Sequence, residues 1–82
     1  MLRIFLAAEQ GRIQQVKITG DFFLHPEENL PKLEKELAGV SLTNDSLLFA
    51  IKSFLENNPT EVYGFSAEDL TKTILQVNNL AI

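Results

Sequence analysis

Eighty-two residues with 45% hydrophobic side chains predict a single globular domain, residues 1–82, with one modest core. The net charge of −4 excludes most nucleic-acid binders, because binding to phosphates needs a clustered excess of Lys and Arg, and the seven basic residues here are scattered. The chain has no cysteine, which excludes disulfides, a thiol nucleophile, iron–sulfur ligation and a cysteine-based zinc site.

The sequence also lacks the apolar segments that a membrane protein needs. No apolar run approaches the ~20 residues of a membrane-spanning helix. The first residues do not form a signal-peptide pattern, because the apolar stretch 2–8 is short and is interrupted by Arg3. We therefore expect a cytoplasmic protein that does not contact a membrane.

The first part of the chain has the two-residue periodicity of β-strands. Residues 2–8 alternate in this way, and a longer strand is expected over residues 13–24. Gly11, between them, can take the positive φ that short hairpin turns require, so the two strands should form an antiparallel hairpin. The core face of the longer strand is expected to carry every second residue: Val16, Ile18, Gly20, Phe22 and Leu24.

The opposite face of the second strand should be solvated, yet it ends in Phe23 close to Asp21. Phe5 falls on the outer face of the first strand, so the two rings are expected to form a sparse aromatic patch. Exposed apolar patches usually mark interaction sites, which makes Phe5, Asp21, Phe22 and Phe23 the candidate partner-binding residues. The alternative is that Phe23 folds beneath the first helix and belongs to the core.

After His25–Pro26 the period becomes helical, and three helices are expected. In the first, near residues 29–39, the apolar stripe is Leu30, Leu33, Leu37 and Val40, and the residues turned to water are Lys32, Glu34, Lys35 and Glu36. The second begins at a cap within residues 43–45 and ends at 57–59. In the third, Ser66 and Asp69 form a capping-box-like pair, and Asn78 and Asn79 end the helix. Residues 62–65 fit either a short strand or an ordered loop.

These elements predict an α+β fold in which an antiparallel hairpin or small sheet is followed by three helices packed on one face. The chain has too little material left to cover the other face of the sheet.

The motifs of catalysis are absent. No glycine-rich phosphate loop or dinucleotide-binding turn occurs, and His25 is the only histidine. A solvated loop position explains His25 better than catalysis does, and Glu27 and Glu28 fit the positive end of a helix dipole. Asp21 could act as an acid or base, but a hydrogen bond to the turn is the simpler use. We expect no catalytic, cofactor-binding or metal-binding residue in this chain.

The stretch Gly11–Phe23, which ends in Gly-Asp-Phe-Phe, resembles the C-terminal accessory domain of lipoate-protein ligases, as does the Leu-Glu-Lys-Glu-Leu-Ala-Gly segment 33–39. The resemblance covers residues 2 to about 74, and the Gly20–Phe23 group is its sharpest part. A chain with its own Met1 is similar to the form in which this domain is a separate small subunit.

The resemblance implies a role in ATP-dependent lipoylation, in which lipoate is activated to lipoyl-adenylate and then transferred to a lysine of an acyl-carrier domain. It implies that ATP and lipoate are bound by a catalytic partner subunit, in a heterodimer, and that this chain supports the adenylation step without a catalytic residue. The residues also leave open a second class of function, a non-enzymatic protein-binding module of the same small α+β fold that is unrelated to lipoylation.

Overall fold

The computed structural model describes residues 2–80, which form four strands and three helices. In chain order they are β1 (Leu2–Glu9), β2 (Arg12–Gly20), β3 (Phe23–His25), α1 (Asn29–Leu37), α2 (Asn44–Asn57), β4 (Glu61–Tyr63) and α3 (Ala67–Leu80). The predicted α+β class is confirmed. The third helix continues past the two asparagines at which we expected it to end, to Leu80.

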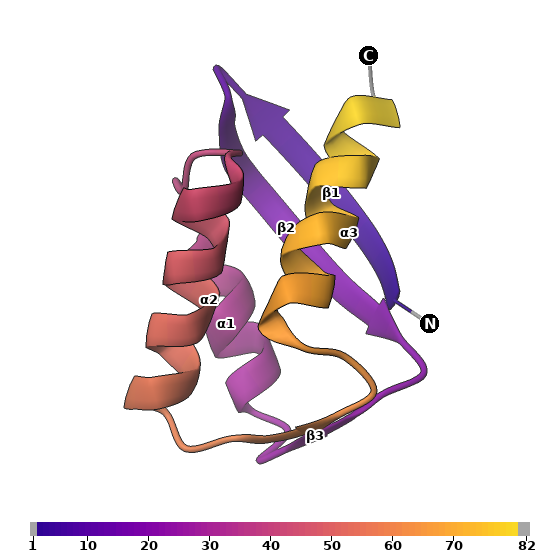
Figure 1. Cartoon of the computed structure of the whole chain (residues 1–82), viewed down its shortest axis with the longest axis vertical. Coiled ribbons are helices and arrows are strands. Elements are labelled where there is room, and N and C mark those ends of the chain that lie inside the picture. Colours follow the sequence, from indigo (N-terminus) through magenta and orange to yellow (C-terminus); the bar gives the residue numbers. More distant parts are fainter. Residues whose placement is uncertain (1, 81–82) are drawn as a thin grey trace.

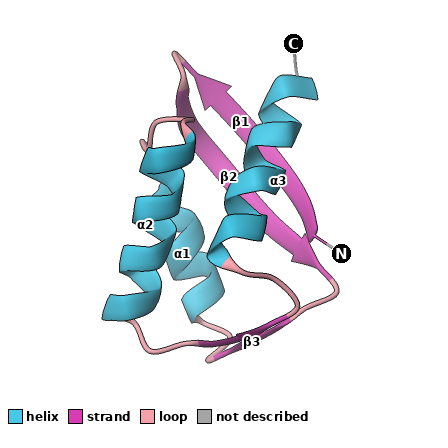
Figure 2. Ribbon diagram, in the orientation of Figure 1, coloured by secondary structure: helices cyan, strands magenta, loops and turns pink. Residues whose placement is uncertain are grey.

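The strands β1 and β2 form an antiparallel hairpin, and all three helices lie on one side of it (Figures 1 and 2). Within that layer, α1 packs on β2 and α3 packs on β1, while α2 packs across α1 and α3. The short strands β3 and β4 form a separate antiparallel pair at the end of the molecule opposite the hairpin turn (Figure 1).

A two-residue turn and a β-bulge set the register of the hairpin. Gln10 and Gly11 both have positive φ, 53° and 72°, as a tight turn that matches the twist of the strands requires. Further on, Ala7 pairs with Gln15 and Ala8 pairs with Ile13, so Gln14 is an extra residue in β2. Because the bulge shifts the alternation by one residue, Ile13 joins Val16 and Ile18 on the core side.

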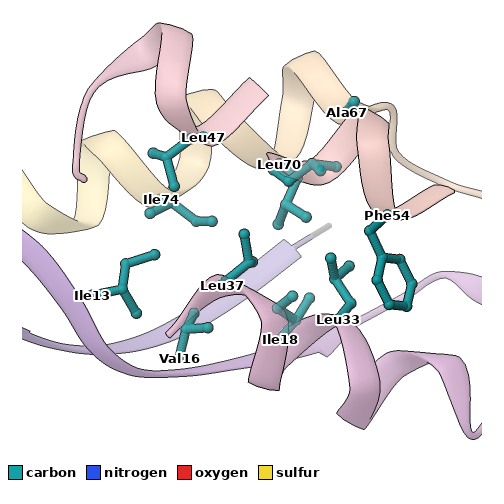
Figure 3. Packing of buried hydrophobic residues seen from close by; sticks show 11 residues of the cluster. Ile13, Val16, Ile18, Leu33, Leu37, Leu47, Phe54, Ala67, Leu70 and Ile74 are labelled. Carbon is teal, nitrogen blue, oxygen red and sulfur yellow. The ribbon is translucent and has the colours of Figure 1, made fainter. Parts of the chain in front are cut away.

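The core lies between the hairpin and the helices (Figure 3). The predicted core face is confirmed for Val16, Ile18 and Leu24, which are buried, but not for Gly20, which is exposed where β2 ends. Every helix adds residues to the same cluster, which contains Ile13, Val16, Ile18, Leu33, Leu37, Leu47, Ile51, Phe54, Ala67, Leu70 and Ile74.

The expected continuous strand over residues 13–24 is wrong, because the chain bends at Asp21, near the end of this range. Gly20 has φ 134° and Asp21 forms a bend, so β2 ends there and β3 leaves the hairpin to pair with β4. The pairing of β3 with β4 brings Gly64 close to Phe22, which is possible because glycine has no side chain. A β-carbon on Gly64, which has φ 113°, would lie 2.9 Å from the β-carbon of Phe22, too close for any side chain. The undecided segment 62–65 thus begins as strand β4.

We expected Glu34 to face water, but its side chain instead forms a hydrogen bond to β2. Its Oε2 accepts a hydrogen bond of 2.7 Å from the backbone N–H of Ile18, on the edge of β2 that β1 does not pair. Near the start of β2 the same edge is covered by the loop after α1, where Ile13 N donates to the carbonyl of Val40 at 2.9 Å. Backbone groups next to a core need partners, and here a helix side chain supplies one.

The starts of α2 and α3 follow the predicted capping chemistry, whereas α1 has no side-chain cap. Ser66 N donates to Asp69 Oδ2 and Asp69 N donates to Ser66 Oγ, both at 3.1 Å, which is the expected capping box of α3. Thr43 caps α2 by accepting from Ser46 N at 3.3 Å. In the first turn of α3, a backbone hydrogen bond and then the nearby Lys52 ammonium hold the pKa of Glu68 below its usual value.

Replacing Ile18 by Ala should destabilise the domain by about 2–4 kcal/mol, because this side chain is buried in mid-strand and its loss leaves a cavity. Thr19→Ala should cost far less, because Thr19 is exposed on the other face. Urea unfolding of both variants measures the difference. Equal losses would mean that the strand register is wrong.

Gly64→Ala should destabilise the domain by at least ~1 kcal/mol more than Gly39→Ala. Both glycines have positive φ, 113° and 88°, but a β-carbon meets the Phe22 backbone at Gly64 and nothing within 4 Å at Gly39. The control therefore isolates the steric part of the effect. Thermal or urea unfolding that gave the two variants the same stability would contradict the close approach.

Candidate partner-binding surface

The pair β3–β4 presents four exposed side chains on its outer side, here called the aromatic face: Phe23, His25, Glu61 and Tyr63. In the register, Phe23 lies opposite Tyr63 and His25 lies opposite Glu61. Phe23 is 54% exposed and Tyr63 is 64% exposed, whereas Leu24, between Phe23 and His25 on β3, is buried on the opposite face. Two-residue alternation thus sorts a strand of three residues into one core side chain and two outward ones.

The three rings of the aromatic face lie side by side. The Phe23 and His25 rings are nearly parallel, with centroids 6.2 Å apart and planes inclined by 9°. The Phe23 and Tyr63 rings have centroids 6.0 Å apart and planes inclined by 42°. The cross-strand pair of Phe23 and Tyr63 stabilises this short sheet, and the rings leave broad surfaces open to solvent.

Polar contacts at the start of α1 fix the position of this short sheet. Asn29 is buried, and its Nδ2 donates a hydrogen bond of 2.8 Å to Thr60 Oγ1, directly before β4. The Thr60 hydroxyl in turn donates to the carbonyl of Asn58. Because α1 also packs on β3, the helix start holds both strands of the pair.

The structure places the four candidate residues of the sequence differently. Phe23 is exposed, so the alternative in which it belongs to the core does not hold. Asp21 is exposed at the bend just before it. Phe22 is half-buried and points the other way, making an edge-to-face contact with Phe65 at a centroid distance of 5.1 Å. Phe22 and Phe23 also line a shallow hollow beside the first turn of α1.

Phe5 is 71% exposed, as expected for the outer face of the hairpin. It lies in a different sheet from Phe23, because the bend at Asp21 separates β2 from β3. Its cross-strand partner is Lys17, and Arg3 is exposed two residues before it on the same strand face. The ring of Phe5 therefore has cationic neighbours, unlike the ring of Phe23.

Sequence reasoning missed Tyr63 and His25 as neighbours of Phe23. The sequence does contain a signal for a strand here, because the apolar Val62 lies between Glu61 and Tyr63, directly before Gly64. A strand assignment there, paired with Phe23–His25, would have placed Tyr63 across from Phe23. The interpretation of residues 13–24 as one strand prevented this pairing from being considered.

The chemistry of the aromatic face suits binding. It offers ring surfaces and the carboxylate of Glu61, a combination that recognises apolar and cationic groups. Within residues 2–80, no three His, Asp or Glu side chains gather closely enough to hold a metal ion. None of the helices described is long and apolar enough to cross a membrane.

Comparison with known proteins identifies the family to which the chain belongs. The family model described as bacterial lipoate protein ligase C-terminus matches residues 1–74. The chain is similar to lipoate-protein ligase A subunit 2 of Thermoplasma acidophilum, with 38% identity over 42 residues, which are 51% of this chain and 45% of that protein. The matched stretch thus spans less than half the length of this curated relative.

A solved structure of an archaeal lipoylation system from the same organism, comprising a bi-partite lipoate protein ligase and its E2 lipoyl domain, contains a chain with the same fold. The TM-score is 0.75 at 30% sequence identity, and the match covers 87% of this chain and 77% of that chain. With a family model that spans nearly all of its described residues and a solved relative of the same fold, the chain belongs to the lipoate protein ligase C-terminus family.

Proposed function

We propose that this chain is the accessory, non-catalytic component of an ATP-dependent lipoate-protein ligase. It acts with a separate catalytic subunit and supports the activation of lipoate to lipoyl-adenylate. The observation that carries the proposal is the similarity to subunit 2 of lipoate-protein ligase A and to a chain of a bi-partite ligase. Family membership also favours this role over a binding module unrelated to lipoylation.

The exposed aromatic rings support a role in docking. Phe23 and Tyr63 lie on the solvent-exposed face of the β3–β4 pair, and each exposes more than half of its surface. Clusters of exposed aromatic side chains are typical of the centres of protein–protein interfaces, where buried rings contribute much of the binding energy. In this proposal the aromatic face lies at the contact with the catalytic subunit, with Phe23 as an apolar anchor and Asp21 at its rim.

The accessory component acts through conformation and supplies no reacting group. ATP and lipoate are bound by the catalytic subunit, and the chain binds more tightly to the conformation of that subunit that is competent for adenylation. A partner can shift such an equilibrium only by its difference in affinity for the two conformations. A ~100-fold preference, equivalent to ~2.7 kcal/mol, would raise a competent state from ~10% to ~90% of the population.

The purified chain alone should form no lipoyl-adenylate and hydrolyse no ATP, because its sequence has no phosphate-binding loop and no basic cluster for a triphosphate. The measurement is adenylate formation with ATP, magnesium and lipoate, with the complete two-part ligase as positive control. Turnover by the chain alone would show that it carries catalytic residues.

Adding the chain to a catalytic subunit that lacks the C-terminal domain should restore lipoate adenylation in a saturable way. Phe23→Ala should raise the concentration needed for half-maximal rate by more than ~5-fold, which corresponds to a loss of about 1 kcal/mol at a contact that anchors the interface. Phe49→Ala, which removes a 75% exposed ring from α2, is the matched control and should leave the titration unchanged.

Circular dichroism must show that all variants of this titration are folded. No rate increase with the wild-type chain would reject the accessory role. A wild-type titration curve for folded Phe23→Ala would leave that role intact but would place the contact elsewhere on the chain.

A further inference from the structure

The aromatic face lies in the most acidic part of the chain. No Lys or Arg occurs between Lys17 and Lys32 or between Lys52 and Lys72, the two stretches that contain β3 and β4. Exposed carboxylates lie within and around this β-pair: Asp21 directly before β3, Glu61 in β4, Glu27 in a shallow hollow with Phe23, and Glu56 in another with His25. Glu61 belongs to the aromatic face itself, directly opposite His25.

The ring surfaces and this carboxylate offer two interactions that stabilise a desolvated cation, a cation–π contact and a charge-assisted hydrogen bond. The face of a Phe or Tyr ring attracts an ammonium or guanidinium group through its quadrupole, most strongly when the site is shielded from solvent. A carboxylate at the edge of the rings can accept charge-assisted hydrogen bonds from the same group. Phe23, Tyr63 and Glu61 stand on adjacent strands, so one incoming side chain can reach all three.

We propose that the aromatic face receives a Lys or Arg side chain presented by the catalytic subunit, with the ring of Phe23 or Tyr63 beneath the cation and Glu61 as its counter-ion. This inference rests on the proposed accessory function and names the chemistry of the partner surface. Charge complementarity selects that occupant, because the surrounding carboxylates repel an acidic surface. The other exposed ring of the sheets, Phe5, lies beside Arg3 and Lys17 and would repel a cation.

The test measures the affinity of the full-length chain for the catalytic subunit by isothermal titration calorimetry. Phe23→Leu keeps an apolar side chain but removes the ring, and should weaken binding about 3- to 10-fold. Glu61→Gln keeps the shape but removes the charge, and should weaken binding similarly while reducing the loss of affinity between 50 and 500 mM salt.

The matched controls carry the same chemical changes elsewhere. Phe49→Leu alters an exposed ring on α2, and Glu9→Gln removes a carboxylate near the hairpin turn, at the opposite end of the molecule from β3 (Figure 1). Both should bind within ~2-fold of wild type, since neither removes a group of the proposed contact. Circular dichroism melts verify folding, and Tyr63→Leu replaces Phe23→Leu if the latter is unfolded.

The outcomes separate the inference from the proposed function. If the wild-type chain binds and restores adenylation but the Phe23 (or substituted Tyr63) and Glu61 variants bind as tightly as wild type, the cation site is wrong and the accessory role stands. If the wild-type chain binds without restoring adenylation, the proposed function fails, and the variants still decide whether a cation is received. Self-association of the chain with the same salt and mutant dependence would identify a second copy as the occupant and overturn the inference.

Discussion

The close approach of Gly64 to the backbone at Phe22 is the constraint on which the binding surface depends. At Gly20 the chain leaves the hairpin with a φ that side chains rarely adopt, and it must then find a new strand partner. That partner is β4, and the residue directly after it must approach the backbone at Phe22 so closely that no β-carbon fits; Gly64 meets this condition. The hydrogen bond between Asn29 and Thr60 then ties the new pair to the first turn of α1.

This arrangement gives a small domain two outer surfaces of different character. The outer face of the hairpin carries Phe5 between basic neighbours, and the β3–β4 pair carries Phe23 and Tyr63 among carboxylates. All three helices are used to cover the inner face, so neither surface is covered by the residues described. These surfaces suffice for the role that we propose, because a component that binds one conformation of a partner better than another needs only a contact surface.

Much of the fold could be predicted from local patterns. The hairpin, the buried positions of β2 and the capping box at Ser66 follow from periodicity and from side-chain chemistry within a few residues. The break at Asp21 could not be predicted in this way, because the alternation of apolar residues continues through it from Val16 to Leu24. The role of Glu34 could not be predicted either. In the sequence it falls on the polar face of the first helix, and only the folded structure brings the edge of β2 beside it. For the site, the sequence identified Phe23 and Asp21, but Tyr63 joins them only through a pairing that spans 40 residues from Phe23.

Amide hydrogen exchange of the chain, with and without the catalytic subunit, tests most directly whether the β3–β4 surface is the contact. Each strand of this pair has a single strand neighbour, so its outer amides should exchange readily in the free chain. We predict that addition of the catalytic subunit slows exchange most strongly within Phe23–His25 and Glu61–Tyr63. Protection confined to β1 and β2, with exchange in β3 and β4 unchanged, would contradict the account.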